Sequence, residues 1–445
     1  MNLSKKIIVI TTALLLILVV AGLLYFFMSN EIEADNFEDN LSERGSSEVD
    51  SPETGSSEVG SYESSTLQQD EIEINDSART EEANAFDVVK NMRVGWNLGN
   101  TFDSIDNMGH GIRSDLYGGS TPIRHYETLW RNPITTREMI DTVVDAGFGA
   151  IRVPVTFTDH MDENFQIRHE WLLRVEQVVG YVLDAGVYCI INIHHDTGSG
   201  SWPWLRADPD NIEQLSEQLD TVWTQIAEHF KDHNEKLIFE SFNEILDTES
   251  RWNNASNAAY LAVNQLNQVF VDAVRATGGN NNDRYLIVKS YAAGIHEDIL
   301  EAFVLPTDSV ESRLIVGVHT YTPHTFTRTQ EAAPWLETHS DWEASRDGQP
   351  VEDIMSRLNE IFVQRGIPVI IGEFGAMNKN NTVDRVNFAR HFVETARRYN
   401  ITCFWWDDGG YFPDADSVNN FAILDRRRTQ WFFYEIVESL VEASS

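Results

Sequence analysis

The sequence predicts an α/β fold: a (β/α)8 TIM barrel over residues 83–445, preceded by an N-terminal transmembrane or signal segment and a disordered acidic linker. In the long C-terminal part, short runs rich in β-branched residues alternate with amphipathic segments of helical length. This alternation is typical of βα units around a parallel sheet. The part is also long enough for eight units, because such barrels commonly have about 250 residues or more.

Eight strand-like runs and the helical segments between them carry this prediction. The runs are Val94–Leu98, Ala150–Pro154, Val187–Ile193, Lys236–Ser241, Tyr285–Lys289, Leu314–Thr320, Pro368–Glu373 and Ile401–Trp406. The helical segments are Thr135–Ala146, Glu170–Ala185, Ile212–Phe230, Ala258–Thr277, Glu352–Arg365, Thr382–Arg398 and Trp431–Val441. Ile295–Val304 is the least regular helix, and Tyr321–Pro350 is expected to be a long loop. A doubly wound open sheet is the alternative, but Gly95 and Gly99 lack the G-x-G-x-x-G spacing of its phosphate loop.

Residues 1–28 are expected to be a signal-anchor or signal peptide. The apolar run Ile7–Met28 follows Lys5 and Lys6, and its 22 residues precede an acidic stretch. As a helix it would measure about 33 Å, close to a hydrocarbon core of about 30 Å, whereas a cleaved signal peptide needs only about 7–15 apolar residues. The lysines predict a cytoplasmic N-terminus. We therefore expect an extracellular or cell-surface protein anchored in the membrane by residues 7–28, with a long cleaved signal peptide as the alternative.

Residues 29–82 are expected to be a disordered linker. From Glu31 to Glu82 there are 17 acidic and two basic residues, few large apolar side chains, and a repeat, GSSEV, at 45–49 and 55–59. Such a segment cannot bury enough apolar surface to fold, and its like charges keep it extended. The linker carries -15 of the formal net charge of -37, and -24 falls on the barrel domain.

The composition excludes several classes of partner. The acidic excess repels phosphate backbones and anionic headgroups, so we expect no nucleic acid and an uncharged substrate. We also expect a monomer. Cys189 and Cys403 are too few for a disulfide scaffold or a four-thiolate zinc site and are expected to be buried thiols without a catalytic role. Among the 12 Trp, the candidates for lining a binding cleft include Trp130, Trp202 and Trp204.

The candidate site residues lie in, at the end of or just after the strand-like runs, because a (β/α)8 barrel gathers its active site at the C-terminal ends of its strands. These residues are Asn97, Arg152, His194, His195, Asn243, Glu244, His319, Tyr321, Glu373 and Trp406. Most single residues of this kind have a structural role. Glu244 and Glu373, however, close runs on opposite sides of the ring and are expected to face one cleft.

Paired carboxylates in a cleft suit glycoside hydrolysis, which needs one protonated group for the leaving oxygen and one ionised group to attack or to activate water. Asn243 directly precedes Glu244, and its amide can hold the 2-hydroxyl of a sugar while Glu244 acts as general acid and then general base. Glu373 is left as the nucleophile.

The remaining candidates can support this chemistry. Arg152 and Tyr321 can keep Glu373 ionised through a positive charge and a hydrogen bond, while His194 and His319 can orient groups and donate to sugar hydroxyls. Trp406 offers a flat apolar face on which a pyranose ring can stack.

A metal-dependent hydrolase is the main alternative enzyme, since the sequence offers metal-binding types. The imaginable ligands are His194, His195, Asp196, His319 and Glu373. Successive side chains of a strand point to opposite faces, so His194 and His195 are not expected to enter one site unless the strand has already ended. We therefore expect no metal and no organic cofactor.

The motifs of residues 86–434 resemble glycoside hydrolase family 5, and within it the endoglucanase and xyloglucanase group called subfamily 4. They are GWNLGNT at 95–101, WRNP at 130–133 with Thr135 and Thr136, IRVPV at 151–155, NIHHD at 192–196, FNE at 242–244, HTY at 319–321, GEFG at 372–375 and WWD at 405–407. One position departs from the group: Asp408 stands where Asn usually follows Trp-Asp. This departure puts a substrate or loop contact near the cleft in doubt.

The resemblance implies a retaining mechanism with Glu244 as acid/base and Glu373 as nucleophile, and a sugar contact for His195. The expected activity is that of an endo-β-1,4-glucanase acting on cellulose-like glucan, mixed-linkage glucan or xyloglucan. The alternatives are a mannanase or xylanase with the same machinery, because specificity resides in loops, and an inactive barrel that binds carbohydrate at the surface.

Overall fold

The computed structural model describes residues 84–106, 123–200, 203–329, 333–410 and 420–445. All of them belong to one compact unit, residues 78–445. The predicted anchor, the predicted linker and Trp202 lie outside the described residues, so those predictions stay untested. Among the helices of the described ranges, none is both long and apolar enough to cross a bilayer.

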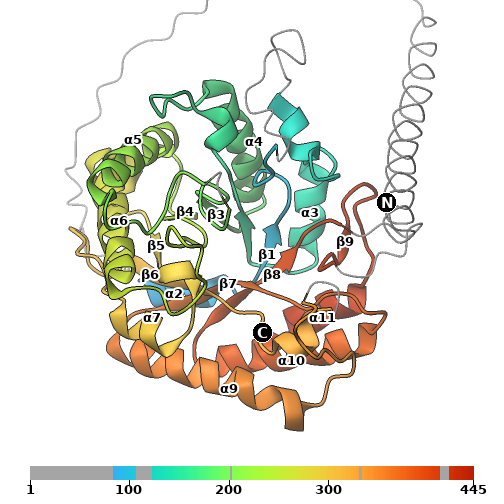
Figure 1. The fold of residues 1–445 in the computed structure, drawn as a ribbon. Helices are drawn as coiled ribbons and strands as arrows, with labels where there is room; N and C mark the ends of the chain where they lie inside the picture. Colours follow the sequence, from blue (N-terminus) through green and yellow to red (C-terminus); the bar gives the residue numbers. More distant parts are fainter. Residues whose placement is uncertain (1–83, 107–122, 201–202, 330–332, 411–419) are drawn as a thin grey trace, which may run out of the picture. The chain divides into compact units, whose positions relative to one another are not determined.

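Eight parallel strands close into a barrel, as predicted (Figure 1). They are β1 (Val94–Leu98), β2 (Ala150–Val153), β3 (Tyr188–Asn192), β4 (Leu237–Glu240), β5 (Leu286–Lys289), β6 (Leu314–His319), β7 (Val369–Phe374) and β8 (Thr402–Asp407). Each strand pairs with the next along the chain, and β8 closes onto β1. The strands are buried on both faces, which explains why they read as continuous apolar runs.

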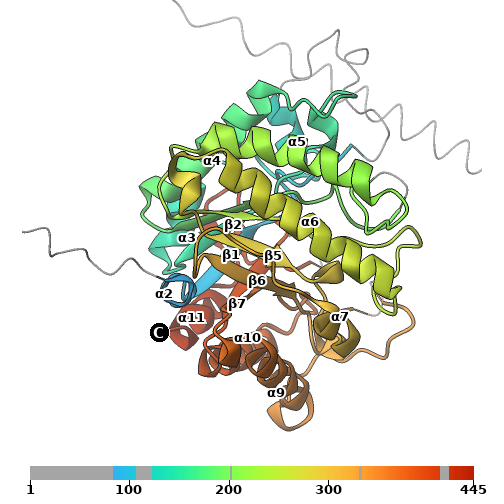
Figure 2. The same ribbon diagram turned by 90° about the vertical axis from the view of Figure 1, so that its left-hand side faces the viewer.

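Helices flank the strands on both sides in the view of Figure 2. They are α2 (Ala85–Asn91), α3 (Arg137–Asp145), α4 (His169–Asp184), α5 (Ile212–Phe230), α6 (Asn257–Ala276), α7 (Glu297–Ala302), α8 (His324–Thr327), α9 (Ala344–Ile361), α10 (Thr382–Arg398) and α11 (Tyr434–Ala443). Short 3-10 helices cover Ile123–Thr128, Thr158–His160, Gly279–Asn282, Tyr291–Ala293 and Val363–Arg365, and a small antiparallel pair joins β9 (Leu424–Asp425) to β10 (Gln430–Trp431). The least regular predicted helix, in the fifth connection, is present as α7.

The segment 321–350 is not one long loop, which corrects the prediction. It contains α8, and α9 begins at Ala344, well before Pro350. The carboxylate of Asp347 accepts from the backbone N–H of Glu343 at 2.9 Å and so stabilises the first turn of α9. With this hydrogen bond, the helix begins at Ala344, before Glu352, where the apolar periodicity of the sequence predicted its start.

Helix α2, which the sequence analysis did not predict, closes the N-terminal end of the barrel. It begins with a capping box, in which Asn84 and Asp87 each accept from the other's backbone N–H. Its apolar face packs against the innermost barrel residues. The Thr402 hydroxyl also donates to the carbonyl of Val89 at 2.6 Å, which ties α2 to β8.

The inward-facing side chains form two layers of opposite chemistry. The layer next to α2 is apolar and consists of Ala150, Ile190, Ile238, Ile287, Ile315, Ile370 and Phe404. Further along the strands lies a buried polar layer of Asn97, Arg152, Asn192, Glu240 and Lys289. The apolar layer supplies the packing that fixes the strands, and the polar layer positions the groups at their carboxyl ends.

Candidate active site

All ten side chains predicted for the site lie at the carboxyl-end side of the barrel. Five belong to strands: Asn97 (β1), Arg152 (β2), His319 (β6), Glu373 (β7) and Trp406 (β8). The other five follow strands: His194 and His195 after β3, Asn243 and Glu244 after β4, and Tyr321 after β6. Hydrogen bonds, ion pairs and ring contacts connect them into one site.

Glu373 is held by two donors, one on each carboxylate oxygen. Arg152 Nη1 donates to Oε1 at 2.8 Å, and the Tyr321 hydroxyl donates to Oε2 at 2.9 Å. Burial raises the pKa of Glu373, while the charges of Arg152 and Lys289 and the two hydrogen bonds act in the opposite direction. These partners favour the ionised form of Glu373.

Glu244 has a different environment, with His319 Nδ1 at 2.8 Å from its Oε1. Burial and the negative charge of Glu373 raise the pKa of Glu244 above its ordinary value. Burial and the charges of Lys289 and Arg152 hold the pKa of His319 well below its usual range, so this histidine is neutral. One oxygen of each glutamate and one nitrogen of His319 lie within 4.8 Å of one another. Two carboxyl groups therefore share one space, and Glu244 is the one with the environment of a proton donor.

Arg152 connects the polar layer to the two asparagines of the site. Its Nη2 donates to Glu240 Oε1 at 2.6 Å, and its Nε to both oxygens of Glu240 at 3.2 Å. The side-chain oxygens of Asn97 and Asn243 each accept from Arg152 at 3.0 Å. The amide nitrogen of Asn97 donates to the carbonyl of Gly372 at 2.9 Å, so Asn97 braces the barrel. Because Asn243 uses its oxygen on Arg152, its amide nitrogen is the atom that can donate to a ligand.

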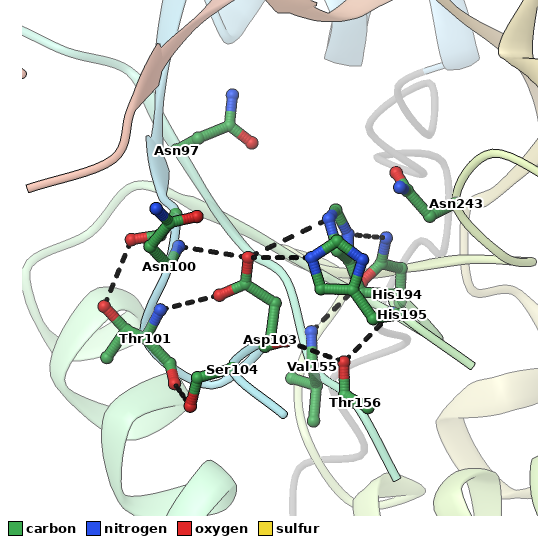
Figure 3. Close-up of polar contacts among 12 residues, drawn as sticks. Asn97, Asn100, Thr101, Asp103, Ser104, Val155, Thr156, His194, His195 and Asn243 are labelled. Carbon is green, nitrogen blue, oxygen red and sulfur yellow. Dashed lines mark hydrogen bonds and ion pairs between the residues drawn. The ribbon is translucent and has the colours of Figure 1, made fainter. Parts of the chain in front are cut away.

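His194 and His195 both face Asp103, which corrects the expectation that adjacent histidines point apart (Figure 3). The strand alternation does not apply to them, because β3 ends at Asn192. Their Nε2 atoms lie 3.9 and 3.8 Å from Asp103 Oδ2. Burial raises the pKa of Asp103 to about 7, and burial lowers the pKa of both histidines. Asn192 Nδ2 lies 3.2 Å from His194 Nδ1, so His194 carries its proton on Nε2, the atom that faces Asp103.

Two groups within the described ranges have the residue types of a metal site. They are Asp103, His194 and His195, and Glu244, His319 and Glu373, with ligand atoms within 4.8 Å of one another in each group. Asp196, a ligand candidate in the sequence analysis, is in neither group, because its oxygens accept from the Phe157 N–H, the Thr158 hydroxyl and the Trp204 indole. The second group is the carboxylate pair itself, already bound to Arg152, Tyr321 and His319. That the site works without a metal stays a prediction.

The tryptophan candidates have different surroundings. Trp406 lies parallel to the ring of His194, with centroids 5.8 Å apart and 7° between planes, and Trp130 lies 5.4 Å from the ring of His195. Trp204 instead donates to Asp196 at 2.9 Å and packs edge-on against Phe165. Trp406 and Trp130 therefore lie beside the site histidines, whereas Trp204 holds a loop in place.

Asp408 makes loop contacts. Its Oδ1 accepts from the N–H of Gly410 and its Oδ2 from the N–H of Phe421, both at 3.1 Å. Burial and the charge of Asp407 raise the pKa of Asp408. An asparagine has one acceptor oxygen in its side chain, so the carboxylate serves this loop better than an amide would. Asp408 therefore makes the loop contact that the departure put in doubt, and its effect on a substrate contact stays untested.

Four residues that the sequence analysis did not select also shape the site: Asp103, Asn192, Glu240 and Lys289. Asn192 and Glu240 are the last residues of β3 and β4 and lie inside the predicted runs, whereas the candidates on these two strands come from the residues that follow the runs. Lys289 ends the fifth run, and the rule that polar residues close the strands would have found it. Asp103 lies in the loop after β1, where no strand pattern applies.

Comparison with known proteins agrees with this geometry. A family profile described as cellulase, glycosyl hydrolase family 5, matches residues 114–411. Endoglucanase A of Ruminococcus albus is 36% identical over 372 residues, which cover 82% of this chain and 94% of that protein.

Two solved structures are similar over nearly their whole length. A GH5-4 broad specificity endoglucanase from Ruminococcus champanellensis with bound cellotriose has a TM-score of 0.73 and 37% identity, covering 82% of this chain and 99% of that one. A family 5 enzyme from Prevotella bryantii in complex with a xyloglucan tetradecasaccharide has a TM-score of 0.71 and 34% identity, covering 82% and 99%. The chain belongs to glycosyl hydrolase family 5, the cellulase family, and is a glycoside hydrolase.

Proposed function

We propose that this enzyme is a retaining endo-β-1,4-glucanase with Glu244 as acid/base and Glu373 as nucleophile. The observation that carries the proposal is the carboxylate pair at the carboxyl end of the barrel, with one oxygen of each within 4.8 Å. Retaining enzymes have carboxyl groups about 5–5.5 Å apart, whereas inverting enzymes separate them by about 6.5–9.5 Å to admit a water molecule. The short separation supports direct attack by one carboxylate.

The surroundings of the two glutamates support this assignment of roles. Arg152 and Tyr321 bind both oxygens of Glu373, which stabilises a carboxylate ready to attack the anomeric carbon. Burial and the charge of Glu373 keep Glu244 protonated, as a general acid must be before the leaving oxygen departs. Once Glu373 is bonded to the sugar its charge is lost, the pKa of Glu244 falls, and Glu244 becomes the base that activates water.

The neighbouring side chains offer contacts for a neutral sugar. The amide nitrogen of Asn243 is available to a 2-hydroxyl, and the Nε2–H of His194 is available to a ring hydroxyl. Trp406 presents a flat apolar face next to His194, on which a pyranose can stack. The side chains of Asn243 and His194 offer hydrogen-bond donors and Trp406 offers an apolar surface, which together suit an uncharged polymer.

The proposed substrates are cellulose-like glucan, mixed-linkage glucan and xyloglucan. The proposal is supported by the relatives: one similar structure holds cellotriose, another holds a xyloglucan fragment, and a curated relative is an endoglucanase. We expect release of reducing ends from carboxymethylcellulose, barley glucan and xyloglucan at rates at least about tenfold above those on mannan and xylan. Chain-length analysis of the products should show early mid-chain cuts.

The same assay distinguishes the alternatives. Faster cleavage of mannan or xylan would replace the glucanase proposal with that of another endo-hydrolase. Binding to all polymers without any release of reducing ends would identify a carbohydrate-binding barrel. Proton NMR of the first product of cellotetraose hydrolysis tests retention, since an initial α-anomer would contradict the nucleophile role of Glu373.

We also propose that the enzyme works outside the cell, anchored by residues 7–28 and spaced from the membrane by the acidic linker. The proposal is supported by the length of the apolar run, by Lys5 and Lys6 before it, and by the linker composition. Immunoblots of membrane and medium fractions should find the full-length chain with the membrane. A shortened chain present only in the medium would mean that residues 1–28 are a cleaved signal peptide.

A further inference from the structure

Lys289, the last residue of β5, is a fully buried cation beneath the carboxylate pair. Its Nζ lies 2.7 Å from His319 Nε2 and 3.6 Å from Glu240 Oε1. Two glycines leave room for the lysine and the imidazole: a Cβ at Gly317 would lie 3.0 Å from Lys289 Cδ, and a Cβ at Gly372 would lie 3.0 Å from His319 Nε2. The contact between Lys289 and His319 therefore depends on the absence of side chains at Gly317 and Gly372 in the neighbouring strands.

This contact determines which nitrogen of His319 carries the proton. An ammonium group has three donors and no acceptor, so it can bond to His319 Nε2 only if that nitrogen is unprotonated. A neutral imidazole then carries its proton on Nδ1, the atom 2.8 Å from Glu244 Oε1. The order of donation therefore runs from Lys289 to His319 and from His319 to Glu244.

We propose that Lys289 is a positioning residue of the glycosidase reaction, which fixes the Nδ1–H tautomer of His319 and thereby directs an N–H donor at Glu244. The inference rests on the acid/base role proposed for Glu244. A donor at Oε1 leaves the other oxygen of Glu244 to hold the proton for the leaving group, and it stabilises the carboxylate formed when that proton departs. The ionised Glu373, with its Oε1 3.6 Å from His319 Nδ1, favours the same tautomer, and the direct contact with Lys289 at 2.7 Å excludes the alternative.

Charge balance gives Lys289 a second effect on the same carboxyl groups. The charged and titratable groups around it are Arg152 of β2, Glu240 of β4, Glu244 after β4, His319 of β6, Glu373 of β7 and His194 after β3. With both histidines neutral and Glu244 protonated, the two cations balance Glu240 and Glu373. Burial lowers the pKa of Lys289 to about 8, with the nearby carboxylates opposing that effect, so the ammonium persists at neutral pH.

The test replaces Lys289 with methionine, which removes charge and donor, and with glutamine, which keeps a neutral donor. Loss of the positive charge destabilises the ionised forms of Glu373 and Glu244, so the pKa of each rises. The acid limb of kcat/KM requires ionised Glu373, and the alkaline limb requires protonated Glu244, so both limbs should move to higher pH, by about one unit. We expect this shift in both variants.

The tautomer is read directly by nitrogen-15 NMR of histidine-labelled resting enzyme, without substrate. Wild type should show His319 protonated on Nδ1, and Lys289→Met should show a mixture of tautomers together with a lower kcat. Lys289→Gln should also show a mixture, because its amide offers an acceptor as well as a donor. Ile287→Val, an inward change one layer deeper on β5, is the control and should leave the tautomer and both limbs unchanged.

The outcomes separate this inference from the proposed function. An Nε2–H tautomer in wild type, or unshifted limbs in a folded Lys289→Gln enzyme, would overturn the role of Lys289 even if the enzyme is an active glucanase. A wild-type enzyme with the Nδ1–H tautomer but without activity on any β-glucan would overturn the proposed function instead.

Discussion

Replacing Glu373 with alanine should lower kcat on β-glucan by about 10⁴-fold or more, because no other carboxylate in the described site can form the glycosyl–enzyme bond. The vacated space lies beside Arg152 Nη1 and the Tyr321 hydroxyl, which bind the carboxylate in the native enzyme at 2.8 and 2.9 Å. These two donors make the space a site for a small anion. With 2,4-dinitrophenyl β-cellobioside, azide should therefore restore turnover and yield the α-glycosyl azide, since it attacks from the side of the missing nucleophile.

The stereochemistry of the azide product separates a lost nucleophile from a damaged fold. Glu301→Ala, at an exposed position on α7, is the matched control and should retain wild-type kcat with no response to azide. A Glu373→Ala enzyme that keeps more than a tenth of its activity, or one that gives the β-glycosyl azide, would contradict the nucleophile role.

The barrel could be predicted from the sequence because both faces of its strands are buried. Continuous runs such as Leu314–His319 mark strands that face the barrel interior on one side and helices on the other. Predicted strand limits differ from the observed ones by at most one residue at either end. Helix α2 could not be found in this way, because its seven residues are too few to establish a helical period, and its reason to form is the open end of the barrel that it covers.

The sequence predicts which residues of the candidate site lie at the strand ends, because their order along the chain is enough for that. It does not predict which of the buried polar side chains contact one another. Glu244 and Glu373 follow from that order, because parallel strands bring their carboxyl ends to one rim. The contact of Glu240 with Arg152 joins residues 88 positions apart, and the contact of Lys289 with His319 joins residues 30 positions apart. Such pairings depend on strand register and on which side chains leave space, and local patterns encode neither.

The histidine pair shows a case in which a local rule, the alternation of side chains along a strand, gave the wrong placement. A strand that continued through His195 would have placed His194 and His195 on opposite faces, as the alternation of side chains along a strand requires. β3 ends at Asn192, whose side chain accepts from the N–H of Val155 and binds Glu240, so the backbone turns away before the histidines. The end of that strand is a tertiary outcome, and the placement of both rings toward Asp103 depends on it.

Replacing Glu244 with alanine should slow polymer hydrolysis by about 10²–10⁴-fold, the usual contribution of a general acid, and should do so selectively. A leaving group that departs without protonation removes the need for the acid, so the first step on 2,4-dinitrophenyl β-cellobioside should remain fast. The glycosyl–enzyme should then accumulate, because no base activates water, and azide should release it as the β-glycosyl azide.

The pH profile gives an independent check of that assignment. Because burial and the charge of Glu373 raise the pKa of Glu244, the high-pH limb of wild-type kcat/KM should lie in the alkaline range, where Glu244 loses its proton. The alanine variant has no proton to lose there, so its profile on the dinitrophenyl substrate should keep the acid limb of Glu373 and lack the alkaline limb. Glu244→Gln is the matched variant, because its amide preserves the size and a hydrogen-bond partner for His319 but cannot exchange a proton. An alkaline limb that persists in both variants would mean that another group, with Lys289 first among the neighbours, titrates in that range and that Glu244 is not the acid.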